Sequence, residues 1–325
     1  MRAAVCRSYG PPEVVTVEDD FPAPVPGPGG VLIRVAAAAV NFPDVLVVAG
    51  EYQVKVPPPF VPGSELAGTV LAVGEGVDRY AVGDRVFGTA IAGAFAEQAV
   101  LPALVLRATP PGVAETSAAA FGVAHRTAFH SLRSIARVQP GDEVIVLGAS
   151  GGVGLAAVEL ATWMGCRVTA VASSPERLAV ATERGAQVAL DRTAGDLRAQ
   201  LREALPDGAD VVIDPVGGEV AEPALRSLRW GGRFVTIGYA AGEIPRIPLN
   251  LVLLKGVTIA GFEFRGFVEH HGEEWLANEA DLMDLFAAGT VGPYVGATFG
   301  LDDAVVALRA VADGQVVGKA VLQID

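Results

Sequence analysis

The pattern of apolar and polar positions along the chain changes near Pro140. Before this point, short runs rich in β-branched residues alternate with clusters of Pro and Gly, which is typical of strands joined by turns. Strands are predicted at 31–36, 68–73 and 84–87, and turns at 22–30, 57–63 and 110–112. The first part of the chain is therefore predicted to be a loop-rich β domain with few helices.

After Pro140, short apolar runs alternate with helical stretches of about ten residues. Strands are predicted at 144–147, 167–172, 187–190, 211–214, 234–237 and 257–260. Helices are predicted between them at 154–164, 175–184, 196–205 and 220–229. Such alternation builds βαβ units, so the fold class is predicted to be α/β with a parallel, doubly wound sheet.

The last segment is too short to form a domain of its own. It contains two predicted helices, 274–288 and 301–312, and a final strand at 320–324. We expect it to pack back onto the β domain. The resulting division is one domain of residues 1–120 plus 262–325 and a second of residues 121–261, which agrees with the two domains that 325 residues predict.

Composition excludes several classes of protein. The chain is 51% hydrophobic, which rules out global disorder, and its net charge of −13 argues against a nucleic-acid partner. Cys6 and Cys166 are too few for a disulfide framework and indicate a reducing compartment. No uncharged apolar run reaches the roughly 18 residues of a membrane span, and the N-terminus lacks the apolar core of a signal peptide. A cytoplasmic protein without membrane contact is expected.

The most informative local motif is a glycine-rich loop between a predicted strand and a predicted helix. Against the pattern G-x-G-x-x-G, it has Ala149, Gly151 and Gly154 at the glycine positions, and Ala still fits a tight turn. Backbone N–H groups and the helix N-terminus of such a loop bind a pyrophosphate. The dinucleotide-binding residues predicted here are Ser150, Gly151, Gly152, Val153 and Gly154; in the alternative, the glycines serve only close helix–sheet packing.

The residues after the second predicted strand of the parallel sheet, 167–172, indicate which of the two nicotinamide dinucleotides, NADH or NADPH, the protein binds. NAD sites usually carry an acidic residue there, whereas this chain has Ser173 and Ser174 followed by Arg177. Two hydroxyls and a guanidinium suit a 2′-phosphate, so NADPH is favoured over NADH, with Arg192 as a second phosphate ligand. Alternatively, Ser173 and Glu176 form a capping box with Arg177 solvated, or Glu176 is the ribose acid.

Motifs spread over the whole chain resemble one enzyme family. They are Asn41-Phe-Pro-Asp44, Gly63-Ser-Glu-Leu-Ala-Gly68, Val82-Gly-Asp-Arg-Val86, Val212-Ile-Asp-Pro-Val-Gly-Gly218 and Gly318-Lys-Ala-Val-Leu322. With the glycine loop, they resemble the zinc-independent quinone oxidoreductase (zeta-crystallin-like) branch of the medium-chain dehydrogenase/reductase superfamily. The resemblance implies a GroES-like, β-rich catalytic domain and a Rossmann domain with a doubly wound parallel sheet.

Two substitutions within these motifs bear on metal binding. Zinc enzymes of the superfamily have Cys where this chain has Asn41 and His where it has Ser64. Since Zn²⁺ needs thiolate, imidazole or carboxylate ligands, and the four His lie elsewhere, no zinc site is predicted. Without a Lewis acid, we expect hydride delivery from NADPH to an acceptor that is already electrophilic.

The resemblance also implies the residues at the reacting centre, which are Tyr52, Asn41, Asp44 and Thr127. Tyr52 would either donate a hydrogen bond to a developing oxyanion or close the cleft. Asn41 and Asp44 would hydrogen-bond near the cofactor ribose or order their loop. Thr127 would lie near the nicotinamide or bond the preceding helical turn.

Further cofactor contacts are implied at the carboxyl edge of the parallel sheet and near the C-terminus. Val216 and Gly217 follow one predicted strand, and Gly238 and Tyr239 follow the next. Lys319 matches a lysine that contacts the cofactor in relatives. The alternative for Lys319 is a solvated side chain at a strand edge.

Three functions remain open from the sequence. The first is an NADPH-dependent quinone reductase that passes hydride to a quinone in the interdomain cleft without a metal. The second is reduction of an activated alkene, an enone or an enoyl thioester, on the same fold. The third is a non-catalytic nucleotide- or RNA-binding protein, which the net charge of −13 opposes. A homodimer is expected through residues 257–262, predicted to be the exposed edge strand of the sheet.

Overall fold

The computed structural model describes residues 1–324, which divide into two compact units. Unit 1 comprises Met1–Val123 together with the chain from Pro293 onward, and unit 2 comprises Ala124–Gly292. The division differs from the predicted one in residues 262–292, which belong to unit 2 rather than to the β domain.

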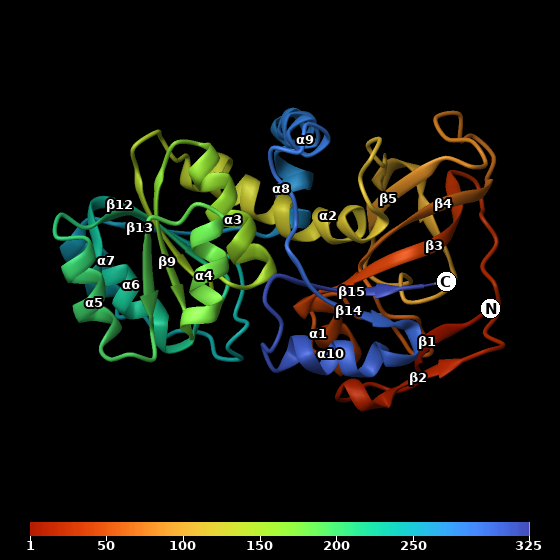
Figure 1. Ribbon diagram of the computed structural model, residues 1–325, viewed down its shortest axis with the longest axis horizontal. Coiled ribbons are helices and arrows are strands. Elements are labelled where there is room, and N and C mark those ends of the chain that lie inside the picture. The colour runs from red at the N-terminus through yellow and green to blue at the C-terminus, as the bar shows by residue number, and fades with distance from the viewer. Residues whose placement is uncertain (325) are drawn as a thin grey trace. The chain divides into compact units, whose positions relative to one another are not determined.

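Unit 1 is built on a seven-stranded sheet, drawn in red, orange and blue in Figure 1. The strand order is β14-β15-β3-β4-β5-β7, and β6 also pairs with β3. A separate hairpin joins β1 (Ala3–Cys6) to β2 (Val15–Glu18), and α1 (Phe42–Ala49) and α10 (Ala304–Ala312) add helices. The sheet strands are β3 (Gly30–Val40), β4 (Glu65–Val73), β5 (Arg85–Thr89), β6 (Gln98–Pro102), β7 (Leu106–Ala108), β14 (Val295–Gly300) and β15 (Lys319–Gln323).

Unit 2 contains the predicted parallel sheet, six strands in the order β10-β9-β8-β11-β12-β13. Apolar residues from its central strands and from its helices form a continuous core, and β13 is an edge strand as predicted. The strands are β8 (Glu143–Leu147), β9 (Arg167–Ala172), β10 (Val188–Asp191), β11 (Ala209–Asp214), β12 (Leu228–Thr236) and β13 (Thr258–Gly261). The helices that follow these strands are α3 (Gly152–Trp163), α4 (Pro175–Glu183), α5 (Leu197–Ala204), α6 (Ala221–Arg226), α7 (Leu249–Lys255), α8 (Phe264–His270) and α9 (Gly272–Ala287).

Two helices in the first part of the chain depart from the predicted pattern. The long helix α2 (Glu115–His130) is rich in buried Ala and Phe, and α1 is rich in Val. Neither range was predicted to be helical, because α1 spans only eight residues and most residues of α2 are buried, which leaves α2 without the broad polar face of a surface helix. No helix within residues 1–324 is both long and apolar enough to cross a bilayer.

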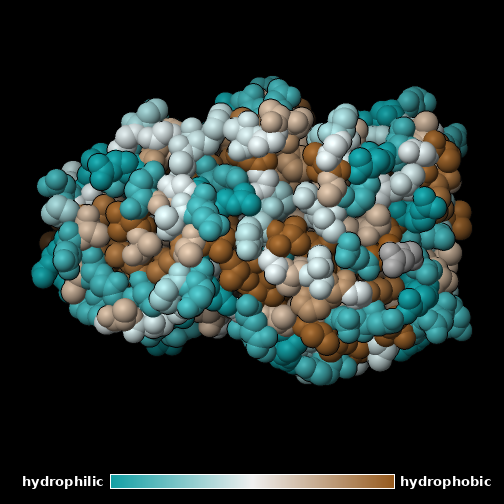
Figure 2. Space-filling model, viewed as in Figure 1, coloured by the Kyte–Doolittle hydropathy of each residue, from teal (hydrophilic) through white to brown (hydrophobic). Residues whose placement is uncertain are grey.

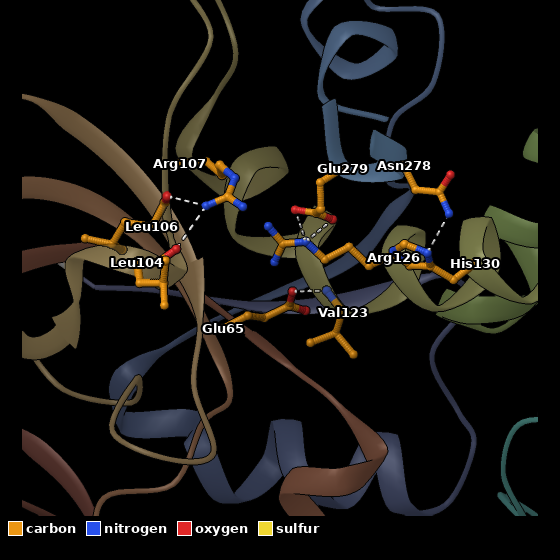
Figure 3. A network of polar contacts seen from close by, with 9 residues as sticks. All are labelled: Glu65, Leu104, Leu106, Arg107, Val123, Arg126, His130, Asn278 and Glu279. Carbon is orange, nitrogen blue, oxygen red and sulfur yellow. Dashed lines mark hydrogen bonds and ion pairs between the residues drawn. The ribbon is translucent and has the colours of Figure 1, made fainter. Parts of the chain in front are cut away.

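Hydrogen bonds to α2 explain why α9 belongs to unit 2 (Figure 3). The Arg126 guanidinium donates to both carboxylate oxygens of Glu279 at 2.8 and 3.0 Å, and both side chains are buried. The Asn278 amide donates to His130 Nδ1 at 3.1 Å and to Ser134 Oγ at 2.9 Å. Removing one partner of a buried ion pair costs about 3–5 kcal/mol, because it leaves the other charge buried and uncompensated. Arg126 and Glu279 must therefore be kept or lost together, and they join α9 to the part of α2 that lies in unit 2.

His130 lies in an aromatic enclosure that keeps it uncharged. Its ring centroid is 4.9 Å from that of Phe267 and 6.1 Å from that of Phe262. Because Nδ1 accepts the Asn278 amide proton, the neutral ring carries its own proton on Nε2. That Nε2 is buried without a hydrogen-bond partner in the described chain. Burial lowers the pKa of His130 from 6.5 to about 4.

This enclosure predicts a specific acid sensitivity. The unfolded chain takes up a proton at His130 near pH 6.5 and the folded chain only near pH 4, so stability is lost as pH falls through this window. The two pKa values differ by about 2.5 units, and each unit corresponds to about 1.4 kcal/mol, so the free energy of unfolding falls by about 3 kcal/mol across this window. His130→Asn keeps an acceptor near the position of Nδ1 but cannot take up a proton. Between pH 7 and pH 4, its free energy of unfolding should fall by about 3 kcal/mol less than that of the wild type. The measurement is urea unfolding at each pH.

His270→Gln is the matched control, because the side chain of His270 is exposed on α8. It should follow the wild-type pH dependence. An unchanged pH dependence in His130→Asn would show that His130 contributes nothing to acid unfolding.

Candidate functional site

Strand pairing in unit 1 brings three distant parts of the sequence together. β3 pairs antiparallel with β4, where Ala39 faces Glu65, and with β15, where Val40 faces Ala320. Asn41 follows β3 directly, and Lys319 begins β15. The register of the sheet therefore places Asn41, Glu65 and Lys319 side by side.

These three side chains and that of Ser64 form a buried network of hydrogen bonds. The Asn41 amide nitrogen donates to Ser64 Oγ at 3.1 Å and to Glu65 Oε1 at 2.9 Å. The Lys319 ammonium donates to Asn41 Oδ1 and to Glu65 Oε1, the latter at 2.6 Å. Each of the four side chains is less than a tenth exposed. The cluster therefore contains a buried cation and a buried anion that neutralise each other.

The second oxygen of Glu65 is also satisfied. Oε2 accepts the backbone N–H of Val123, in the part of α2 that belongs to unit 1, at 2.8 Å (Figure 3). Both oxygens of this carboxylate thus have donors, as a buried anion requires. Glu65 was not among the predicted site residues, although it lies beside Ser64 in the Gly63–Gly68 motif.

Asp44 lies beside this network in the first turn of α1. Its Oδ2 accepts the backbone N–H of Asn41, the N-cap residue, at 2.7 Å. Oδ1 is buried and has no hydrogen-bond partner in the described chain. Burial raises the pKa of Asp44 to about 7, against the opposing effects of the Asn41 N–H, the Ser64 hydroxyl and the Lys319 charge. Asp44 therefore changes its charge near neutral pH.

The donor set at positions 41 and 64 does not suit zinc. An amide and a hydroxyl stand there, and they are hydrogen-bonded to each other rather than free to bind a cation. Within residues 1–324, no group of three or more His, Cys, Asp or Glu side chains is arranged to hold a metal ion. Zinc independence remains a prediction that rests on the identity of these residues.

Tyr52 and Thr127 lie in different units. Tyr52 is in the loop after α1 and packs, partly buried, against the core of unit 1. Thr127 lies in the part of α2 that belongs to unit 2. Their predicted roles beside the nicotinamide remain predictions.

The glycine loop of unit 2 joins β8 to α3 as predicted. A Cβ on Gly154 would lie 2.0 Å from the Gly148 carbonyl oxygen, so only glycine fits this close crossing of loop and helix. Gly148 has a φ of +59°, which also favours glycine. Gly151 is the N-cap of α3 and has no side chain to cap the helix. The first-turn N–H groups at Gly152, Val153 and Gly154 are therefore suited to bind an anion.

The residues predicted to recognise a 2′-phosphate lie next to this loop. Ser174 is the N-cap of α4, and its Oγ accepts the backbone N–H of Arg177 at 3.4 Å. The Arg177 guanidinium reaches Ser150 Oγ of the glycine loop, also at 3.4 Å. Because Ser174 caps the helix, the alternative of a capping box between Ser173 and Glu176 is wrong. Arg192 pairs with the exposed Glu219 at 3.4 Å, next to the same sheet edge.

Asp214 organises the neighbouring turn and was missed by the sequence analysis. Its Oδ1 accepts the backbone N–H groups of Val216 at 2.9 Å and Gly217 at 2.8 Å. A Cβ on Gly217 would lie 2.8 Å from the Tyr239 ring, so the turn after β11 touches the loop after β12. Backbone bonds from Ala240, Ala241 and Gly218 join the same two loops. Val216, Gly217, Gly238 and Tyr239 are thus brought to one edge of the sheet, as predicted.

Each of the two units contains a range of residues that matches a known protein family. Residues 27–111 match the alcohol dehydrogenase GroES-like domain, and residues 152–281 match the family described as zinc-binding dehydrogenase. A quinone oxidoreductase-like protein 2 homolog from Nematostella vectensis is 37% identical over 99% of this chain and 88% of its own length. The chain belongs to the quinone oxidoreductase-like branch of the medium-chain dehydrogenase/reductase superfamily.

Solved structures of this branch resemble the chain over its whole length. A mycobacterial protein complexed with NADPH is 33% identical, with a TM-score of 0.91 over 99% of each chain. The Escherichia coli quinone oxidoreductase complexed with NADPH is 25% identical, with a TM-score of 0.91 over 99% of this chain and all of that chain. The protein is thus an NAD(P)-dependent oxidoreductase related to the quinone oxidoreductases.

Proposed function

We propose that this quinone oxidoreductase-like protein uses NADPH to reduce a quinone, without a metal ion. The observation that carries the proposal is the hydrogen-bonded cluster of Asn41, Ser64, Glu65 and Lys319. In this cluster an amide and a hydroxyl occupy the two positions where zinc enzymes of the superfamily have Cys and His, and the Glu65 carboxylate is paired with an ammonium. A carbonyl that needs polarisation by a metal is then a poor substrate. A quinone is electrophilic without it. The names of the relatives support the same choice.

The residues of unit 2 fit NADPH. The uncapped N-terminus of α3 and the glycine loop would hold the pyrophosphate, while Arg177, Ser174 and Ser150 would hold the 2′-phosphate. The carboxyl edge at Gly217 and Tyr239 would bind the rest of the dinucleotide. When bound, the cofactor supplies a hydride; with one proton, a quinone becomes a hydroquinone and NADPH becomes NADP⁺.

The enzymatic test compares two acceptors at the same NADPH concentration. Oxidation of NADPH by the purified protein should be fast with 1,4-benzoquinone and slow with crotonyl-CoA, because only the quinone fits the proposed reaction. Rapid turnover of crotonyl-CoA alone would support an enoyl-thioester reductase instead. NADPH binding without turnover of either acceptor would contradict both activities. Any benzoquinone reduction by NADPH in the absence of protein is subtracted.

The 2′-phosphate site predicts a difference between the two nicotinamide dinucleotides. Arg177→Ala should weaken NADPH binding about tenfold to a hundredfold, since a charge-assisted hydrogen bond contributes about 1.5–3 kcal/mol. NADH binding should change by less than about twofold, because NADH has no phosphate at this position. Isothermal titration gives both dissociation constants.

Arg198→Ala is the matched control, since Arg198 is an exposed arginine on α5 in the same unit. It should leave both dissociation constants unchanged. Equal losses for NADPH and NADH in Arg177→Ala would overturn the assignment of Arg177 to the phosphate.

We also propose a homodimer formed through the edge strand β13. Large apolar side chains are exposed around this edge, on β12, on α7 and on the loop between them: Trp230, Ile244, Leu249, Leu253 and Leu254. Figure 2 shows apolar surface over the end of unit 2 where Figure 1 draws α6 and α7. An unpaired strand edge beside such a patch favours association with a second copy.

A single charge in the patch tests the dimer. Leu253→Glu should make the protein monomeric in sedimentation equilibrium, because a carboxylate would have to be buried in the interface. Leu104→Glu, an equally exposed leucine in unit 1, should remain dimeric. A monomeric wild-type protein, or a dimeric Leu253→Glu variant, would contradict this interface.

A further inference from the structure

The position of Lys319 differs from that expected for a residue that holds a cofactor. Its side chain is only 5% exposed, and its ammonium lies between Asn41 Oδ1 and Glu65 Oε1 inside unit 1. The alternative of a solvated side chain at a strand edge is wrong.

One consequence concerns the orientation of the Asn41 amide. Its nitrogen donates to Ser64 and to Glu65, so its oxygen must face the ammonium. A flipped amide would turn its N–H groups toward the Lys319 ammonium and its oxygen toward the Glu65 carboxylate, which are both repulsive contacts. Lys319 and Glu65 together thus allow only one orientation of Asn41.

The second consequence concerns Asp44. The backbone N–H of Asn41 binds its Oδ2, while its Oδ1 has no donor in the described chain. Lys319 is the cation that acts on this carboxyl group, and Glu65 opposes it more weakly. An ionised Asp44 would add a second anion to a buried cluster that holds one cation. Burial raises the pKa of Asp44, and the Asn41 N–H, the Ser64 hydroxyl and the Lys319 charge lower it, so Lys319 is one of three groups that favour ionisation of Asp44.

We propose that Lys319 is a positioning residue for the reduction, which fixes the Asn41 amide and supplies the positive charge of the buried cluster that Asp44 adjoins, and that it does not bind the cofactor itself. The inference rests on the proposed function, since hydride transfer builds negative charge on the acceptor. For an acceptor bound beside Asn41 and Asp44, as the family resemblance implies, a second buried anion at Asp44 would oppose that charge. The form with neutral Asp44 is then the active one, and activity falls as pH rises through its pKa of about 7.

The test uses variants that separate the charge from the shape of the side chain. Lys319→Met removes the charge, and Lys319→Arg retains it. Glu65→Gln combined with Lys319→Met removes cation and anion together, which avoids an unpaired buried charge and keeps the variant foldable. Lys255→Met, on α7 in unit 2, controls for the loss of a positive charge elsewhere.

Three measurements distinguish positioning from direct cofactor binding. They are the dissociation constant of NADPH, the pH dependence of kcat with benzoquinone, and the titration of the Asp44 carboxyl by infrared difference spectroscopy without cofactor, assigned with Asp44→Asn. In Lys319→Met, kcat should fall at least about tenfold while NADPH affinity stays within about twofold. The Asp44 titration and the alkaline limb of kcat should both move to higher pH, because a cation that favours the ionised carboxylate is lost.

Lys319→Arg and the double variant test whether the charge of Lys319, rather than its shape, is what matters. Lys319→Arg should restore much of kcat and the wild-type titration of Asp44, and the double variant should fold and show a smaller upward shift. Loss of NADPH affinity with an unchanged Asp44 titration would overturn the proposal in favour of a direct cofactor contact. If the wild type reduces no quinone, the proposed function fails, while the titration and the NADPH affinity still decide the role of Lys319.

Discussion

The antiparallel pairing of β15 with β3 is the constraint on which the candidate site of unit 1 depends. It carries Lys319, near the end of the chain, to Asn41 and to the first residue of β4. Neither Lys319 nor Glu65 could remain ionised and buried alone, because the desolvation of one unpaired charge costs several kcal/mol. The strand pairing and the ion pair therefore depend on each other: the sheet brings the charges together, and the charges require the register that the sheet has.

Unit 2 also contains a buried ion pair that joins residues distant in the sequence. Arg126 and Glu279 are separated by more than 150 positions in sequence and form a buried bidentate pair. Asn278 uses both of its amide protons, one on His130 and one on Ser134. Buried polar groups of this kind accept few alternative partners, so they specify where α9 packs more narrowly than apolar contacts alone would.

The parts of the fold that could be predicted from the sequence are those with local signals. The alternation of strands and helices after Pro140, the glycine loop before α3 and the edge position of β13 all follow from short-range patterns and were confirmed. The predicted site residues at the sheet edge, such as Ser150 and Arg177, were brought together because parallel strands end on one side of a sheet. The roles of these residues remain predictions, as do those of Tyr52 and Thr127.

The parts that could not be predicted depend on contacts between distant positions. Nothing local marks Glu65 as the partner of Lys319, or Glu279 as the partner of Arg126, since each pair is set by tertiary packing. The same holds for residues 262–292, whose attachment to α2 decides the unit to which they belong.

The full engagement of Glu65 has a consequence for how this site can evolve. One oxygen serves Asn41 and Lys319, and the other serves the backbone of α2. Introducing Cys at position 41 and His at position 64 would not by itself create a metal centre, because the neighbouring ammonium would repel a divalent cation. A lineage that gained zinc from this arrangement would have to replace Lys319 as well. Each change made alone would break a buried hydrogen bond, so a zinc site could arise here only through coupled substitutions.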